Sequence, residues 1–156
     1  MDFDRAFELL IGHEGGYTDG KGDPGGRTKY GISQRAYPGE DIAALTLDRA
    51  KAIYLRDYWR PAGCDLLPDA LRFDVFDLAV NSGVKTAVKT LQRAVGAVDD
   101  GILGPKTIRA AQMTPVDAAR RRIAGQRLQL MTRQPTWDRF GRGWAGRVAA
   151  NLLMEG

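Results

Sequence analysis

Two carboxylic acids and a hydroxyl group lie near the start of the chain, in a stretch that is rich in glycine. Asp23 follows Glu14 by nine positions, and Thr28 follows Asp23 by five. A pair of carboxyl groups, one acting as an acid and the other as a base, nucleophile or stabiliser, is what hydrolysis of a glycosidic bond requires. These three residues are therefore the candidate catalytic groups.

The segment that leads to Glu14 has the periodicity of an amphipathic helix. Apolar residues at 3, 7, 10 and 11 predict a helix over residues 3–14, with Glu14 on the apolar face of its last turn. Partial burial and the negative end of the helix dipole would both favour the protonated carboxyl group. A neutral carboxylic acid is the form that a general acid needs.

Seven glycines fall within residues 15–31. Glycine lets the backbone approach a ligand closely and adopt positive φ. Tyr17 and Tyr30 are candidates for residues that flank a cleft and contact a sugar. The same residues are also typical of a helix cap, a solvated Asp-Pro turn and a short hairpin, and their spacing alone leaves both interpretations open.

The sequence HEGGY at 13–17, followed by GDPGGRTKYGIS at 22–33, resembles the opening of the glycoside hydrolase family 108 muramidases, which occur among phage endolysins and bacterial secretion activators. The Glu-x8-Asp-x4-Thr spacing is also similar to that of phage-type lysozymes, whose pattern is one residue longer before the Thr. The resemblance implies that Glu14 is the catalytic acid, with Asp23 and Thr28 as its partners. It also implies hydrolysis of the β-1,4 bond between N-acetylmuramic acid and N-acetylglucosamine in peptidoglycan.

Helical periodicity continues through the rest of the chain, and it predicts a mainly α fold. The expected helices are a short one at 33–36, one that is capped by Thr46 and ends before Pro61, and others over 69–82, 84–95, 105–112, about 115–133 and from 136 onward. The segment 69–82 is apolar on most sides, which predicts the central buried helix.

Two residues on these helices are further candidates for contact with substrate. Tyr58 either packs in the core or forms part of a cleft wall, and packing is the commoner role of an aromatic residue at helical spacing. Asn81 either caps the 69–82 helix or donates hydrogen bonds to substrate. The segment FDLAVNSG at 76–83 resembles one that recurs in the same family.

The stretch LQRAVGAVDDGILGPKT at 91–107 resembles the peptidoglycan-binding segment that accompanies this type of muramidase. A tight loop between two helices, with a turn at Asp100-Gly101, would account for the same residues. The resemblance implies a lysozyme-like fold in one compact unit. A catalytic lobe with the small glycine-rich hairpin would cover 1–67, and a helical peptidoglycan-binding lobe would cover 68–156.

The formal charge is +4 and the isoelectric point is near 9.4. Eight arginines come late in the chain, at 120, 121, 122, 127, 133, 139, 142 and 147. A solvated helix face is the default interpretation of such charge, and attraction to an anionic cell envelope is another. No nucleic-acid-binding motif accompanies it, so we expect no nucleic acid as a partner. The family resemblance implies bacterial peptidoglycan as the partner.

One cysteine and one histidine cannot form a disulfide framework or the usual zinc site, so we expect no metal and no cofactor. We also expect a monomer. The first residues contain acids and no long apolar run, which predicts neither a signal peptide nor a membrane span. Synthesis in the cytoplasm would then require a holin-type or secretion route to the cell wall.

Two alternative functions fit the same residues. A lytic transglycosylase needs only one acid/base carboxyl group, so Glu14 would suffice. A non-catalytic wall-binding or secretion-helper protein would keep the fold and bind peptidoglycan without cutting it.

Overall fold

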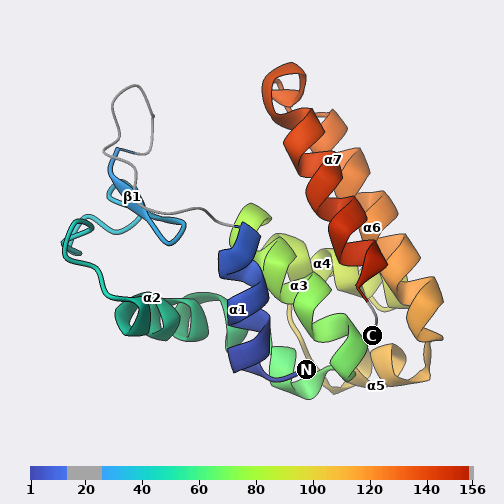
Figure 1. Ribbon diagram of the computed structural model, residues 1–156. Coiled ribbons are helices and arrows are strands. Elements are labelled where there is room, and N and C mark those ends of the chain that lie inside the picture. Colours follow the sequence, from blue (N-terminus) through green and yellow to red (C-terminus); the bar gives the residue numbers. More distant parts are fainter. Residues whose placement is uncertain (14–25, 155–156) are drawn as a thin grey trace.

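The computed structural model describes residues 1–13 and 26–154, and over these residues the protein is mainly helical with one small hairpin (Figure 1). The elements in chain order are α1 (Phe3–His13), β1 (Thr28–Lys29), β2 (Ile32–Ser33), α2 (Leu47–Tyr54), the π-helical turn η1 (Leu55–Trp59), the 3-10 turn η2 (Cys64–Leu66), α3 (Asp69–Ser82), α4 (Val84–Val95), α5 (Pro105–Met113), α6 (Val116–Thr132) and α7 (Trp137–Leu153). The predicted fold class, mainly α and lysozyme-like with a hairpin lobe beside a helical bundle, is confirmed.

Helix α3 is the centre of the molecule, as its apolar sequence predicts. It packs against α1, α4, α6 and both short helical turns. Its bounds match the predicted ones because Pro68 precedes its first residue and Gly83, at φ 87°, follows its last. The hairpin and α2 lie on one side of α1, and α4 to α7 surround α3 on the other (Figure 1).

A cluster of aromatic rings joins α1, α2 and η1 to α3. The Phe76 ring centroid lies 5.9 Å from that of Phe3, 6.3 Å from that of Tyr54 and 5.4 Å from that of Trp59. In each pair the rings meet edge to face, which is a favourable arrangement for aromatic side chains. Phe76 and Trp59 are both fully buried. The position of α1 therefore depends on this cluster.

In the segment from the hairpin to α3, the structure confirms one prediction made from the sequence and contradicts another. The Thr46 hydroxyl accepts a hydrogen bond from the Arg49 amide at 3.1 Å, which confirms the predicted helix cap. The helix predicted at 33–36 is wrong, because the segment forms a single turn, although the Ser33 hydroxyl caps that turn by accepting a bond from the Ala36 amide at 3.3 Å. Ser33 instead pairs with Thr28 across the hairpin, and its carbonyl accepts a bond from the Tyr37 amide at 3.0 Å, so only one turn follows.

The loop between α4 and α5 is held by one buried amide, that of Gln92. Its Nε2 donates to the Asp100 carboxylate at 2.7 Å and to the Ile102 carbonyl at 3.0 Å. Its Oε1 accepts a bond from the Gly101 amide at 2.9 Å. Gly101 has φ 81°, a conformation that glycine adopts without strain. The predicted turn at Asp100-Gly101 is confirmed.

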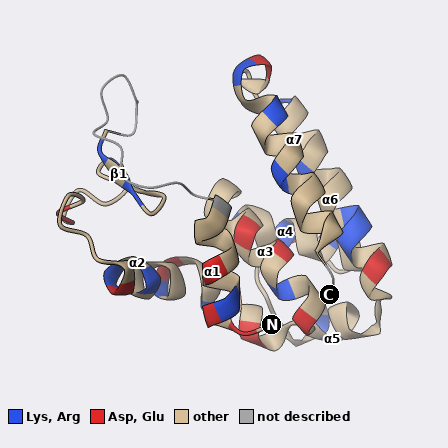
Figure 2. Ribbon diagram, viewed as in Figure 1, with Lys and Arg blue, Asp and Glu red and all other residues tan. Residues whose placement is uncertain are grey.

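Helices α6 and α7 form a long hairpin that extends beyond the other helices (Figure 1). Figure 2 shows Lys and Arg along both helices. A solvated face is the correct interpretation for Arg121, Arg133, Arg139 and Arg142, which are exposed. It is wrong for Arg120, Arg127 and Arg147, whose side chains turn inward to acids on α3.

Two glycines on α7 allow a matched test of how the Trp137 ring packs on this helix. A Cβ atom at Gly141 would lie 2.5 Å from the Trp137 ring, whereas one at Gly143 would meet no atom within 4 Å. Gly143→Ala should raise the free energy of unfolding by roughly 1 kcal/mol through helix propensity. Gly141→Ala should lower it, because overpacking costs about 1–3 kcal/mol. Urea denaturation measures both, and equal effects of the two variants would contradict the packing of Trp137 on Gly141.

Two further sequence expectations concern Cys64 and membrane spans. Cys64 is fully buried, and burial raises the pKa of its thiol to about 12, so it is an inert core residue as expected. Within residues 1–13 and 26–154, no helix has the length and apolar character needed to cross a bilayer.

Candidate functional site

Three of the seven candidate residues, Glu14, Tyr17 and Asp23, lie outside the described residues. The structure does place the end of the helix that precedes them. The amino group of Met1 lies 2.9 Å from the Asp69 carboxylate, so α1 and α3 begin together, and they run in the same direction (Figure 1). His13, the last residue of α1, therefore lies toward the end of α3 that carries Asn81.

Thr28 and Tyr30 lie in the hairpin. The Thr28 hydroxyl donates to the Gly26 carbonyl at 3.3 Å. Tyr30 has φ 51°, which is unusual for a residue with a side chain, and its carbonyl accepts a bond from the Tyr54 hydroxyl at 2.9 Å. Tyr30 thus attaches the hairpin to α2. Its ring lies 5.5 Å from the Lys29 ammonium and is partly exposed.

Tyr58 lies in η1, on the side of the molecule that carries the hairpin. Its ring packs on Tyr54 at 5.6 Å, and its hydroxyl is 3.3 Å from that of Tyr37. The Tyr37 hydroxyl donates to Asp57, and burial together with the Tyr58 contact raises the pKa of Tyr37. Asp57 also accepts two bonds from Arg56, which hold the pKa of Asp57 below its usual value. The packing interpretation of Tyr58 is therefore well founded, because it belongs to a satisfied polar cluster.

Asn81 lies at the end of α3, beside a groove of about 420 Å³. The groove separates the α3–α4 junction from the α6–α7 hairpin, and it is lined by Asn81, Ser82, Thr86, Leu130, Met131, Gln134, Thr136 and Trp144. The Asn81 amide nitrogen donates to the Asp77 carbonyl at 2.6 Å and to the Asp77 carboxylate at 3.2 Å. These bonds point back along α3, so Asn81 lines a cavity and does not cap the helix.

Asp77 is fully buried and is the centre of an ionic network between α3, α6 and α7. One carboxylate oxygen accepts bonds from Arg147 and Asn81, and the other pairs with Arg127 and accepts a bond from Asn151 at 2.9 Å. Burial alone would raise the pKa of Asp77, but the two arginines outweigh it and hold that pKa below the usual value. Asp77 is therefore an anion that accepts hydrogen bonds at neutral pH.

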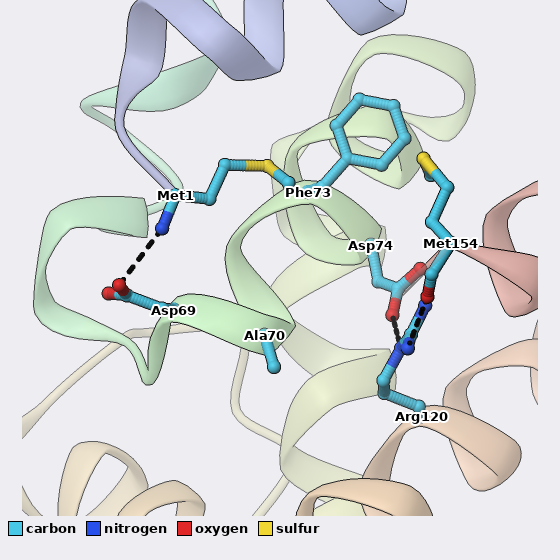
Figure 3. Close-up of a pocket in the computed structure, with 7 residues that line it drawn as sticks. All are labelled: Met1, Asp69, Ala70, Phe73, Asp74, Arg120 and Met154. Atoms are coloured by element: carbon cyan, nitrogen blue, oxygen red, sulfur yellow. Dashed lines mark hydrogen bonds and ion pairs between the residues drawn. The ribbon is translucent and has the colours of Figure 1, made fainter. Parts of the chain in front are cut away.

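A second cavity, of about 280 Å³, lies at the opposite end of α3 (Figure 3). Arg120 crosses it, donating to the Asp74 carboxylate and to the Met154 carbonyl, each at 3.0 Å. Burial raises the pKa of Asp74 in spite of Arg120. Of the candidate residues that the structure describes, Thr28, Tyr30, Tyr58 and Asn81, none lines this cavity. Its polar groups are paired with one another, which is typical of a structural contact between chain segments.

Asp74, Asp77 and their arginine partners were not predicted from the sequence. A signal was present, because an acid within a helix that is apolar all round must be paired if it is buried. The partners come 46 to 70 positions later, and no local pattern indicates which arginines they are. Among the described residues, no three His, Cys, Asp or Glu side chains are grouped so that they could hold a metal ion.

Comparison with known proteins places the chain in a family. No curated protein sequence matches it. The family described as "Glycosyl hydrolase 108" matches residues 7–83. Among solved structures, the chain is similar to SagA of Brucella abortus, with a TM-score of 0.87 and 34% identity over 96% of this chain and 91% of that one. The chain therefore belongs to the glycosyl hydrolase 108 family.

Proposed function

We propose that this protein is a peptidoglycan hydrolase of the muramidase type, which cleaves the β-1,4 bond between N-acetylmuramic acid and N-acetylglucosamine. The observation that supports it is the family match over residues 7–83, which spans all three candidate catalytic residues. Membership makes the chain a glycoside hydrolase at the level of the family. The particular bond and the roles of the residues are our proposal.

In this proposal Glu14 protonates the glycosidic oxygen of the leaving sugar. It follows His13, the last residue of α1, in the chain. The start of that helix is fixed by the contacts of Phe3 with Trp59 and Phe76. A rigid element is the support that a catalytic acid needs, because small displacements cost much of the rate. Asp23 would stay ionised and stabilise positive charge on the sugar or orient a water molecule, with Thr28 helping to hold that water.

The groove beside Asn81 also supports the proposal. It lies at the end of α3 toward which α1 also runs, and its polar and aromatic lining is of the kind that binds sugars. A glycan chain that occupies the groove could extend toward the end of α1 at His13. Access to the cell wall in the organism would come after release from the cytoplasm.

The test is mass spectrometry of peptidoglycan digested by the wild type and by Glu14→Gln. We expect reducing muramic acid ends from the wild type and a rate at least about 100-fold lower from the variant, since general acid catalysis contributes 10²–10⁴-fold. Glu8→Gln is the matched control, because Glu8 is an exposed glutamate of α1 whose carboxylate pairs with Arg5.

Three outcomes would overturn the proposal. If Glu14→Gln kept most of the rate, Glu14 would not be the acid. Anhydro ends among the products would identify a lytic transglycosylase, in which Asp23→Ala should change little. Binding to the wall without any product would indicate a protein that binds peptidoglycan but does not cut it.

A further inference from the structure

Tyr54, the last residue of α2, contacts four parts of the molecule with one side chain. Its ring centroid lies 5.7 Å from that of Phe7 on α1, 6.3 Å from that of Phe76 on α3 and 5.6 Å from that of Tyr58 in η1. Its hydroxyl donates to the Tyr30 carbonyl in the hairpin at 2.9 Å. The side chain therefore joins the hairpin directly to the aromatic cluster between α1 and α3.

The hydroxyl of Tyr54 has a fixed position, because the ring that carries it is held from several sides. Tyr54 is 1% exposed, and its neighbours Phe7 and Phe76 are also buried. Side chains in a protein core pack as densely as molecules in an organic crystal, so the ring cannot shift by itself. The donor that Tyr54 offers to the hairpin is therefore anchored in the core.

The acceptor lies in the turn of the hairpin, where the backbone has an unfavourable conformation. Lys29 pairs with Ile32, so Tyr30 and Gly31 form a two-residue turn, with φ of 51° and 74°. Positive φ at both positions is typical of a type I′ turn, which favours Asn or Gly over a bulky residue at its first position. Such a conformation persists where surrounding contacts hold it. The bond from Tyr54 is a contact of this kind.

Other contacts hold the hairpin less precisely. The Lys29 ammonium donates to the Ala43 carbonyl at 3.2 Å, but this bond is exposed and ends in a loop. Ile32 is buried, but apolar burial has no preferred direction. The Tyr54 hydroxyl supplies a directional link between the hairpin and a helix.

The two parts of the chain that Tyr54 joins lead to the candidate catalytic groups. Thr28 comes two positions before Tyr30, within the hairpin. Glu14 comes seven positions after Phe7 in the sequence. Catalytic groups must be held within about 0.5 Å of their productive geometry by supporting contacts. The bond from Tyr54 to the hairpin is therefore placed where it can set the position of Thr28 relative to α1.

We infer that Tyr54 is a positioning residue for hydrolysis, which holds the hairpin and its Thr28 in place beside α1. The inference rests on the proposed function, because it takes Thr28 to belong to the catalytic site. Tyr54 acts through the Tyr30 carbonyl, since its own ring is buried in the core.

The test is Tyr54→Phe, which removes the hydroxyl and keeps the ring. At a temperature well below Tm, kcat for soluble peptidoglycan strands should fall at least about tenfold, because displaced catalytic groups lose rate steeply. KM should stay within about threefold of the wild-type value, because every side chain of the hairpin is retained. In hydrogen-exchange mass spectrometry without substrate, the amides of residues 26–33 should exchange at least about fivefold faster, and those of α1 and α3 at the wild-type rate.

Tyr37→Phe is the matched control. It also removes a tyrosine hydroxyl that donates a hydrogen bond, to Asp57 at 3.1 Å, and it leaves the bond between Tyr54 and Tyr30 in place. Both variants should lower Tm by about 2–4 °C, the effect of one lost hydrogen bond. Only Tyr54→Phe should lower kcat and speed exchange in the hairpin.

Three results would overturn the inference. They are a wild-type kcat in Tyr54→Phe, an equal loss of kcat in Tyr54→Phe and Tyr37→Phe, and unchanged exchange over residues 26–33 in Tyr54→Phe. Failure of the proposed function would look different, because the wild type itself would then release no product. The exchange measurement needs no substrate, so it would still decide whether Tyr54 holds the hairpin.

Discussion

Replacing Asp77 by asparagine is expected to lower the free energy of unfolding by about 3–5 kcal/mol, because it removes the carboxylate that pairs with the buried Arg127 and with Arg147. Arg127 is 3% exposed and Arg147 13% exposed, so solvent cannot substitute for the lost carboxylate. Urea denaturation at neutral pH measures the change. Asp65→Asn is the control, since Asp65 is exposed and its variant should stay within about 0.5 kcal/mol of the wild type.

The same network predicts how stability depends on pH. The pKa of Asp77 is lower in the folded protein than its usual value, so the folded state holds fewer protons there than the unfolded state. The stabilisation is complete above the ordinary pKa of an aspartate, about 4, and is lost as the pH falls through the lower folded value. Asp77→Asn should therefore lose less stability than the wild type on acidification. A loss equal to that of the wild type would contradict the role of Asp77.

Replacing all three residues distinguishes two contributions to stability. One is the attraction between the opposite charges, and the other is the cost of leaving a buried charge unpaired. If Asp77, Arg127 and Arg147 all become apolar, part of the lost stability should return, because the charges of this network then leave the core together. A triple variant that is less stable than Asp77→Asn alone would mean that the arginines stabilise the fold by other contacts. The comparison follows the logic of a mutant cycle.

Replacing Phe76 by alanine is expected to cost about 3–5 kcal/mol, the usual range for removing a buried phenylalanine ring. Phe76 is fully buried and meets Phe3, Tyr54 and Trp59, so its loss would leave a cavity between three elements. Thermal or urea unfolding measures the change. Hydrolysis of peptidoglycan should fall with it, because Phe3 of α1 would lose an edge-to-face contact.

Phe140→Ala provides the comparison for Phe76. Phe140 is 42% exposed on α7, where it contacts Trp144, so its removal should cost about 1 kcal/mol or less. Phe76→Leu conserves most of the volume and should cost less than about 1.5 kcal/mol. Equal effects of the alanine changes at 76 and 140 would show that the aromatic cluster does not hold α1 to α3.

Much of the helical framework could be predicted because its limits are encoded locally. The bounds of α3 follow from Pro68 and Gly83, and the start of α5 follows from Pro105. The short helix at 33–36 was wrong because strand pairing of Ser33 with Thr28 decides that segment. Tertiary pairing of this kind overrides local propensity.

The candidate site was predictable only in part. Asn81 lines the groove, and its contact with substrate stays a prediction; its partner Asp77 was not foreseen. The inward arginines were not foreseen either, because a sequence shows charge and not the direction of a side chain. Glu14, Tyr17 and Asp23 stay predictions, to be tested by the substitution experiments above.

The shared position of Asp77 also has an evolutionary consequence. Residues from three helices pair with one another at Asp77, so a substitution on one helix removes an ionic or hydrogen-bonding partner from a residue on another helix. Exchange of the network for an apolar core would pass through intermediates that are several kcal/mol less stable than either end point. We therefore expect positions 77, 127 and 147 to change together among related proteins, because a single substitution there would be selected against before a compensating one occurs.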